Sequence, residues 1–182
     1  MIHRLKSILF ISLVLLFSCS GPSKEQQEML DTQAQLEKDL EMYKYVWERF
    51  FEGDTSIVND KYFTEDVVVV TDQGDLVGIE AVKNFYLNYF LGFSDAEFTI
   101  VDAFGQGDKI VKYWNFKGVH TGDFFGIPAS GNKLDLSGTT LVSIKDGKIS
   151  REQDFFDMMS LFNQLKQTSG DVTVDDQNQG VL

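Results

Sequence analysis

The stretch LDLSGTTLVSIKDGKISREQDFF, residues 134–156, decides the fold class of this chain. Apolar and polar residues alternate on both sides of its centre, and a period of two predicts β-strands. The centre holds the pair Asp146-Gly147, which a two-residue hairpin favours because both turn residues need positive φ. The sequence therefore predicts two long antiparallel strands, one over residues 134–144 and the other over residues 149–156.

The segments before this hairpin continue the sheet. Residues 97–104 and 110–116 alternate in a similar way on either side of a Gln-Gly-Asp turn at 106–108. Residues 67–70 are four consecutive valines, and β-branched side chains pack well in a strand. A meander of antiparallel strands is therefore expected from the middle of the chain onward.

Helices are predicted on the N-terminal side of the sheet. Apolar residues recur at spacings of three and four from Leu36 to Phe50, and again over residues 79–91, which is the period of an amphipathic helix. A short helix is expected over residues 56–62, and a closing helical turn over residues 158–165. Helices followed by antiparallel strands predict an α+β fold with the helices on one side of a curved sheet.

Several short motifs occur in the order and at the spacing of a known family. They are Gly118-Val119-His120-Thr121-Gly122, Phe125-Gly126-Ile127-Pro128, Ser130-Gly131-Asn132-Lys133, Asp146-Gly147-Lys148-Ile149, Asp157 and Asn163-Gln164-Leu165. Together they resemble the SnoaL-like polyketide cyclase family of the nuclear transport factor 2-like superfamily. The resemblance implies a cone-shaped domain whose N-terminal helices pack on a curved antiparallel sheet around an apolar pocket. It also implies cofactor-free aldol chemistry, with the aspartate at position 157 as general acid/base.

Asp157 admits two interpretations. A carboxylate takes a proton from carbon most effectively when apolar surroundings raise its pKa toward the working pH, which would suit a catalytic base in the pocket. Asp157 also directly precedes the helical segment that starts at Met158, where it could cap a free backbone N–H. Asp154 is the reserve carboxylate for the catalytic role.

His120 is a second candidate proton carrier, because imidazole titrates near neutral pH. It is the only histidine beyond residue 18, and the alternative is a structural imidazole bonded to a backbone carbonyl. A lone histidine cannot form a histidine metal cluster. The chain also lacks a Gly-x-Ser-x-Gly elbow and a phosphate-binding Gly-Lys-Ser/Thr loop. The sequence therefore predicts neither a metal nor a cofactor.

Aromatic residues are abundant, with 16 Phe, 6 Tyr and 2 Trp in the chain. Those on elements that would surround the pocket predict walls for a small, flat, apolar molecule. The predicted pocket residues are Tyr43, Trp47, Phe85, Tyr89, Trp114, Phe116, Gln153 and Phe155. The alternative for each of them is packing in an ordinary core.

The N-terminal residues predict export. Arg4 and Lys6 precede an apolar run over residues 8–17, which fits a signal peptide and is shorter than the roughly 20 residues of a membrane span. Leu-Phe-Ser-Cys at 16–19 resembles the lipobox of bacterial lipoproteins, which implies cleavage before Cys19 and lipidation of its thiol. The alternative is an ordinary signal peptide in which the cysteine is incidental. Serine rather than aspartate after the cysteine favours anchoring in the outer membrane.

The chain therefore divides into four predicted segments. They are a signal peptide (1–18), a polar tether carrying lipidated Cys19 (19–28), a SnoaL-like domain (29–167) and a disordered polar tail (168–182). The net charge is −12, and it becomes −14 once Arg4 and Lys6 leave with the signal peptide. Such a charge makes nucleic acid a poor partner.

These observations predict a lipid-anchored domain at the cell envelope that binds a small apolar molecule. The expected chemistry is of the cyclase, isomerase or dehydratase type, by general acid/base catalysis without a cofactor. The competing class is a non-catalytic module for ligand binding or protein assembly. In that class, the outer face of the sheet or the pocket mouth would bind another protein or a second copy of the chain in a homodimer.

Overall fold

A computed structural model of the protein describes residues 21–166. The predictions for the signal peptide, for lipidation of Cys19 and for the tail at 168–182 concern residues outside this range. Within it, no helix combines the length and the apolar character that crossing a membrane requires.

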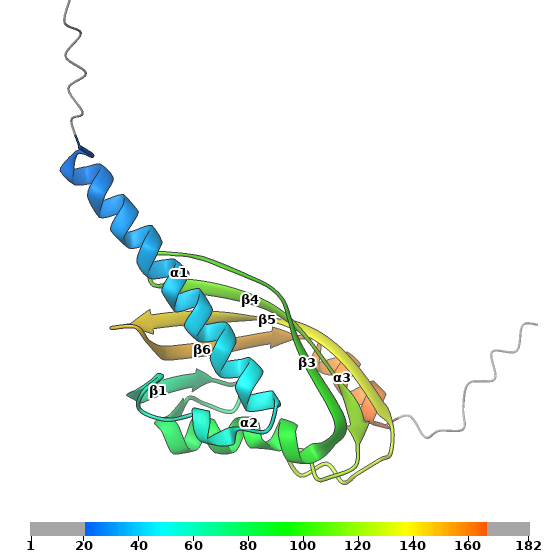
Figure 1. The fold of residues 1–182 in the computed structure, drawn as a ribbon. Coiled ribbons are helices and arrows are strands. Elements are labelled where there is room, and N and C mark those ends of the chain that lie inside the picture. Colours follow the sequence, from blue (N-terminus) through cyan, green and yellow to red (C-terminus); the bar gives the residue numbers. More distant parts are fainter. Residues whose placement is uncertain (1–20, 167–182) are drawn as a thin grey trace, which may run out of the picture.

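Helix α1 (Lys24–Phe51) is longer than its apolar stripe predicts. It begins inside the segment expected to be a polar tether, because Ser23 and Gln26 form a capping box there. The Ser23 hydroxyl accepts from the Gln26 backbone N–H at 3.2 Å, and the Gln26 side chain accepts from the Ser23 N–H at 2.8 Å. Residues 24–35 are exposed, and this part of α1 extends beyond the sheet (Figure 1).

The sheet has six strands in the order β2-β1-β6-β5-β4-β3. Their bounds are β1 (Phe63–Val70), β2 (Leu76–Val77), β3 (Phe93–Gln106), β4 (Lys109–His120), β5 (Lys133–Lys145) and β6 (Lys148–Phe156). The predicted hairpin is confirmed, with φ of 53° at Asp146 and 71° at Gly147. Neighbouring strands are antiparallel except β1 and β6, which are parallel. No tight turn joins β1 to β6, so nothing forces these two strands to run in opposite directions.

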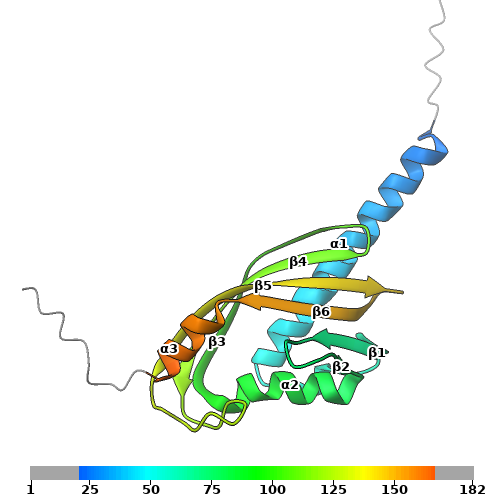
Figure 2. The same ribbon diagram turned by 180° about the vertical axis from the view of Figure 1, so that it is seen from behind.

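Helix α1 crosses one face of the curved sheet, in front of it in Figure 1 and behind it in Figure 2, whereas α3 (Met158–Lys166) lies beyond the end of β6, beside β5. Helix α2 (Ile79–Gly92) follows β2, and α3 follows β6. The helix expected over residues 56–62 is reduced to one 3₁₀ turn, η1 (Thr55–Ile57). The sheet face turned toward α1 and α2 carries the apolar core, and burial along β4 alternates residue by residue accordingly.

A β-bulge in the last hairpin decides which residues of β6 face this core. Ile144 pairs with Ile149, but the next pair is Ser143 with Arg151, so one extra residue of β6 is inserted. Ile149 is buried before the bulge and Glu152 is buried after it. In a regular strand, Ile149 would share a face with Arg151 and Gln153, but the one-residue slip places it on the same face as Glu152 instead.

Candidate functional site

A cavity of about 710 Å³ lies among α2, the turn between β1 and β2, the end of β6 and α3. This volume is within the range of about 300–1,000 Å³ that is usual for ligand pockets. Its apolar wall consists of Val70, Leu76, Phe85, Tyr89, Phe124, Phe125, Ile127, Phe155, Phe156, Met158, Leu161 and Phe162. Its polar wall consists of Thr71, Asp72, Gln73, Asp75, Gln153 and Asp154. The cavity suits an apolar molecule that meets a few polar groups.

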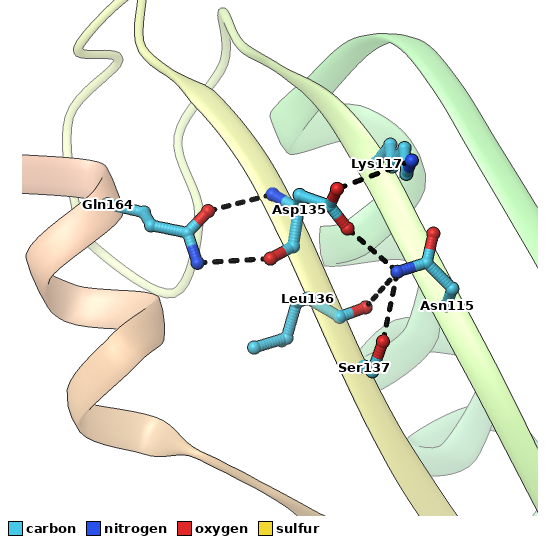
Figure 3. Close-up of polar contacts among 6 residues, drawn as sticks. All are labelled: Asn115, Lys117, Asp135, Leu136, Ser137 and Gln164. Atoms are coloured by element: carbon cyan, nitrogen blue, oxygen red, sulfur yellow. Dashed lines mark hydrogen bonds and ion pairs between the residues drawn. The ribbon is translucent and has the colours of Figure 1, made fainter.

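Helix α3 forms one side of this cavity and is fixed to β5 by a side chain. The Gln164 amide oxygen accepts from the Asp135 backbone N–H at 2.8 Å, and its NH₂ donates to the Asp135 carbonyl at 3.0 Å (Figure 3). The Asp135 carboxylate accepts in turn from Asn115 on β4 at 2.7 Å. These bonds hold Leu161 and Phe162 at the cavity wall.

Asp154 on β6 is the half-buried aspartate of the cavity wall. The Tyr86 hydroxyl on α2 lies 3.1 Å from its Oδ2, and the Thr140 hydroxyl on β5 donates to its Oδ1. Trp114 donates from its indole nitrogen to the Thr140 hydroxyl at 3.1 Å. Sheet register explains why the Thr140 hydroxyl reaches Asp154. The two residues are paired across β5 and β6, and Lys112 of β4 continues the same row.

A second, smaller cavity of about 30 Å³ also has Asp154 in its wall. It is lined by Trp47, Phe51, Tyr86, Tyr89, Phe98, Lys112, Trp114, Phe116 and Asp154. Asp154 therefore lines both cavities. The Lys112 side chain is 3% exposed, and its ammonium lies 5.0 Å from the Trp47 ring centroid and 5.2 Å from that of Tyr43.

Glu152 is fully buried beside this group. Its Oε1 accepts from the Tyr43 hydroxyl at 2.5 Å and from the Trp47 indole N–H at 3.1 Å. Its Oε2 lies 3.3 Å from the Tyr86 hydroxyl. Two aromatic donors of α1 and one hydroxyl of α2 thus surround a carboxyl group on the sheet.

Burial dominates the electrostatics of this cluster. The pKa of Glu152 is raised to about 7, chiefly by removal from water and also by nearby Asp154, while Lys112 and the donors Tyr43 and Trp47 oppose the rise. Burial lowers the pKa of Lys112, and the two carboxylates oppose that shift. The pKa of Tyr86 is raised well above its usual value, first by burial and then by Asp154 and Glu152. The tyrosine therefore stays neutral and keeps its proton for hydrogen bonding.

Asp157 lies outside the cavity walls and is exposed. Strand β6 ends at Phe156, so residue 157 is not part of the strand that brings Gln153 and Asp154 to the cavity wall. Its Oδ1 accepts from the Ser160 backbone N–H at 3.0 Å, at the start of α3. This is the geometry of the helix cap that was the alternative interpretation.

His120 is fully buried at the end of β4 and lines neither cavity. Its Nδ1 lies 3.1 Å from the Ser130 hydroxyl oxygen and 3.3 Å from the Ser130 backbone nitrogen. The ring therefore contacts these two groups and not the backbone carbonyl that was predicted. The ring packs 5.2 Å from Phe93, and Nε2 has no hydrogen-bond partner within the described residues.

The predicted pocket residues are divided between the two cavities. Phe85, Tyr89, Gln153 and Phe155 line the larger cavity, and Trp47, Tyr89, Trp114 and Phe116 line the smaller one. Tyr43 is a core residue whose hydroxyl bonds Glu152. Between residues 21 and 166, no group of three or more His, Cys, Asp or Glu side chains is placed to hold a metal ion.

Sequence reasoning missed four residues of the site: Tyr86, Lys112, Thr140 and Glu152. Lys112 carried a usable signal, because it stands in phase with the buried Ile110 and Trp114 of β4. A charged residue at an apolar position of an alternating strand indicates a buried polar partner. Glu152 had no such signal, since the bulge that turns it inward is not encoded in the alternation.

The model of the family described as SnoaL-like polyketide cyclase matches residues 40–165, which is more than half of the chain. No curated protein gives a match. The resemblance predicted from the sequence motifs is therefore confirmed at the level of the family.

Solved structures also match this fold. A protein described as a SnoaL-like polyketide cyclase from Jannaschia sp. CCS1 is 21% identical, with a TM-score of 0.65 over 70% of this chain and 91% of that chain. TsrD from Streptomyces laurentii is 25% identical, with a TM-score of 0.62 over 73% of this chain and 96% of that chain. A protein described as a polyketide cyclase from Acidithiobacillus ferrooxidans is 26% identical, with a TM-score of 0.58 over 72% and 96%.

Proposed function

Because the chain belongs to the SnoaL-like polyketide cyclase family, we propose that it binds a small, flat, largely apolar molecule and performs cofactor-free general acid/base chemistry on it. The proton carrier in this proposal is Asp154. One observation carries the assignment: its carboxylate is on the wall of the 710 Å³ cavity and is oriented there by Tyr86 and Thr140. The other carboxylates of that wall, Asp72 and Asp75, are exposed on the turn between β1 and β2.

The proposed chemistry is the transfer of a proton from a carbon atom beside a carbonyl group. Asp154 takes the proton, the electron pair of the broken C–H bond forms an enolate, and the enolate then attacks an internal carbonyl or is reprotonated. The first outcome is a cyclisation and the second an isomerisation, and both return the proton from the carboxyl group. A positioned acid/base group of this kind contributes about 10²–10⁴-fold to the rate.

The charges around the cavity favour a neutral ligand over an anionic one. Among the described residues that line it, three are aspartates, and none is lysine, arginine or histidine. An anionic head group placed there would be repelled without a compensating cation. Rings such as Phe85, Tyr89 and Phe124 instead offer faces and edges for a flat molecule.

Binding in this cavity can be tested with a probe molecule and with a substitution whose larger side chain occupies the cavity. The purified protein is titrated calorimetrically with a hydroxylated anthraquinone, as a neutral flat probe, and with an anthraquinone sulfonate as its anionic counterpart. We expect the neutral probe to bind at least about tenfold more tightly, a difference of about 1.4 kcal/mol. Replacing Ile127 with tryptophan should weaken the neutral probe by a similar factor, because the indole would occupy the cavity.

The matched control is Val101→Trp, which places the same indole on β3 at a residue that is 53% exposed and lines neither cavity. It should bind the probe as the unaltered protein does. Equal loss of binding in both variants, or equal affinity for the two probes, would contradict the proposed site. Binding without any proton exchange at the ligand would favour the non-catalytic module.

We also propose that the domain is held at the outer membrane by lipid on Cys19. The support comes from the sequence: an apolar leader, a lipobox-like stretch at 16–19 and the absence of any other cysteine in the chain. Because each buried CH₂ contributes about 0.8 kcal/mol, more than one acyl chain anchors a protein stably. The projecting start of α1 would then separate the cavity from the bilayer.

The anchoring proposal predicts a specific effect of Cys19→Ala in a bacterial host. The unaltered chain should incorporate a fatty-acid label during growth and sediment with the membrane fraction. The variant should lose the label and appear in the soluble fraction or as an uncleaved precursor. Ser18→Ala, which keeps the thiol and a small residue before it, serves as the control and should remain labelled. Full labelling of Cys19→Ala would refute lipidation at this residue.

A further inference from the structure

The Tyr86 hydroxyl lies between the two inward-facing carboxyl groups of β6. It is 3.3 Å from Glu152 Oε2 and 3.1 Å from Asp154 Oδ2. We propose that Glu152 and Asp154 share one proton through this hydroxyl, and that Glu152 stores the proton while Asp154 acts as a base. This inference deepens the proposed function and rests on it for its catalytic meaning.

The number of available donors supports a shared proton. A tyrosine hydroxyl has one proton to donate, whereas two ionised carboxylates would both need to accept from it. If Tyr86 donates to Asp154, then Glu152 Oε2 faces the tyrosine oxygen and must itself carry a proton to bond it. If Tyr86 donates to Glu152, the same reasoning places the proton on Asp154 Oδ2. In either arrangement, one proton shared by the two carboxyl groups gives each of the oxygens that face one another a hydrogen-bond partner.

The remaining contacts fix the other oxygen of each carboxyl group. Glu152 Oε1 accepts from Tyr43 and Trp47, so a proton on that oxygen would displace a donor. Asp154 Oδ1 accepts from the Thr140 hydroxyl, which in turn accepts from the Trp114 indole N–H. The oxygens that face Tyr86 are therefore the ones at which a proton fits.

The charges of the cluster agree with one shared proton. The titratable groups that face the pair are Tyr43 of α1, Tyr86 and Tyr89 of α2, and Lys112 of β4. Burial raises the pKa of all three tyrosines, so they are neutral. Two carboxyl groups with one proton carry a charge of −1, which the ammonium of buried Lys112 balances. Both groups act on Lys112, so the negative charge can lie on either one.

The exchange between the two arrangements balances without any added reagent. Glu152 Oε2 gives its proton to the Tyr86 oxygen while the Tyr86 hydroxyl gives its own proton to Asp154 Oδ2. Tyr86 is unchanged, one proton has moved from Glu152 to Asp154, and the negative charge has moved the opposite way. Asp154 can thus face a substrate as a base or as an acid from the same resting cluster.

The shared proton is tested on the purified, ligand-free protein by ¹³C NMR of carboxyl-labelled Asp and Glu across a pH titration. We expect the chemical shifts of the Asp154 and Glu152 carboxyl carbons to change together in one titration step. Each change should be a substantial fraction of the change that full protonation of a carboxyl group produces. In Tyr86→Phe, that step should appear at the Glu152 carbon, and the Asp154 carbon should show only a small response.

Tyr89→Phe is the matched control, since it removes a hydroxyl from the same helix one turn later and should leave the joint step unchanged. The proposal is overturned if Asp154 takes no part in the Glu152 step of the unaltered protein, or if Tyr86→Phe retains the joint step. If the unaltered protein shows no joint step, the proposals of ligand binding and of Asp154 as a base still stand. If the anthraquinone probe does not bind, the joint step can still be observed. The shared proton and the proposed function can therefore fail separately.

Discussion

Replacing Asp154 with asparagine is expected to abolish most proton exchange at the bound ligand while leaving ligand binding intact. Asparagine keeps the size and the acceptor oxygen that Thr140 contacts, but it cannot take up a proton. Removing a general base costs about 10²–10⁴-fold in rate. The measurement is deuterium uptake from D₂O into the carbon skeleton of a molecule recovered from the protein, followed by mass spectrometry.

The control for this prediction is the neighbouring substitution Asp157→Asn. Asparagine is as good an N-cap as aspartate, so the stability of α3 should change by less than about 1 kcal/mol. Asp157 is exposed and lines neither cavity, so the rate of deuterium uptake should not change. If Asp157→Asn slows the exchange and Asp154→Asn does not, Asp154 is the wrong carboxylate and the motif-based assignment of Asp157 stands.

Local patterns were sufficient to predict the elements of this fold. The Asp146-Gly147 turn fixed the last hairpin, because few other residues accept two successive positive φ values at a tight turn. The alternation of β4 likewise predicted Trp114 and Phe116 as inward-facing residues, and both are buried. These signals lie within a few residues of the structure they determine, so a single sequence reveals them.

The catalytic arrangement depends on pairings that such patterns do not encode. Without the bulge near Ser143, Thr140 would pair one residue earlier on β6 and Asp154 would point away from the core. The row that joins Lys112 to Asp154 also crosses β5, so it requires the register of two strand pairs at once. The family motif pointed instead to Asp157, whose side chain the start of α3 directs to Ser160.

The buried carboxyl group of Glu152 should make the protein less stable as the pH rises from about 5 to about 8. Its folded-state pKa is about 7, above the 4.5 of the free side chain, so folding favours the protonated form. The stability that the neutral group provides is fully present below pH 4.5 and is lost as the pH rises through 7. A shift from 4.5 to about 7 corresponds to about 3 kcal/mol.

Glu152→Gln should remove this dependence, because glutamine imitates the protonated carboxyl group. Its carbonyl oxygen can accept from Tyr43 and Trp47, and its NH₂ can donate to the Tyr86 oxygen. Chemical denaturation should therefore find the variant similar to the unaltered protein near pH 5 and more stable by about 3 kcal/mol near pH 8.

The exposed Glu65→Gln variant makes the same change in net charge and should show no such gain. A constant difference between Glu152→Gln and the unaltered protein at both pH values would mean that Glu152 does not change its protonation state between them. In that case, Glu152 would neither gain nor lose a proton between these two pH values, contrary to the joint step expected of the pair. The stability measurement therefore tests the same hydrogen-bond arrangement as the carboxyl NMR titration, by an independent property.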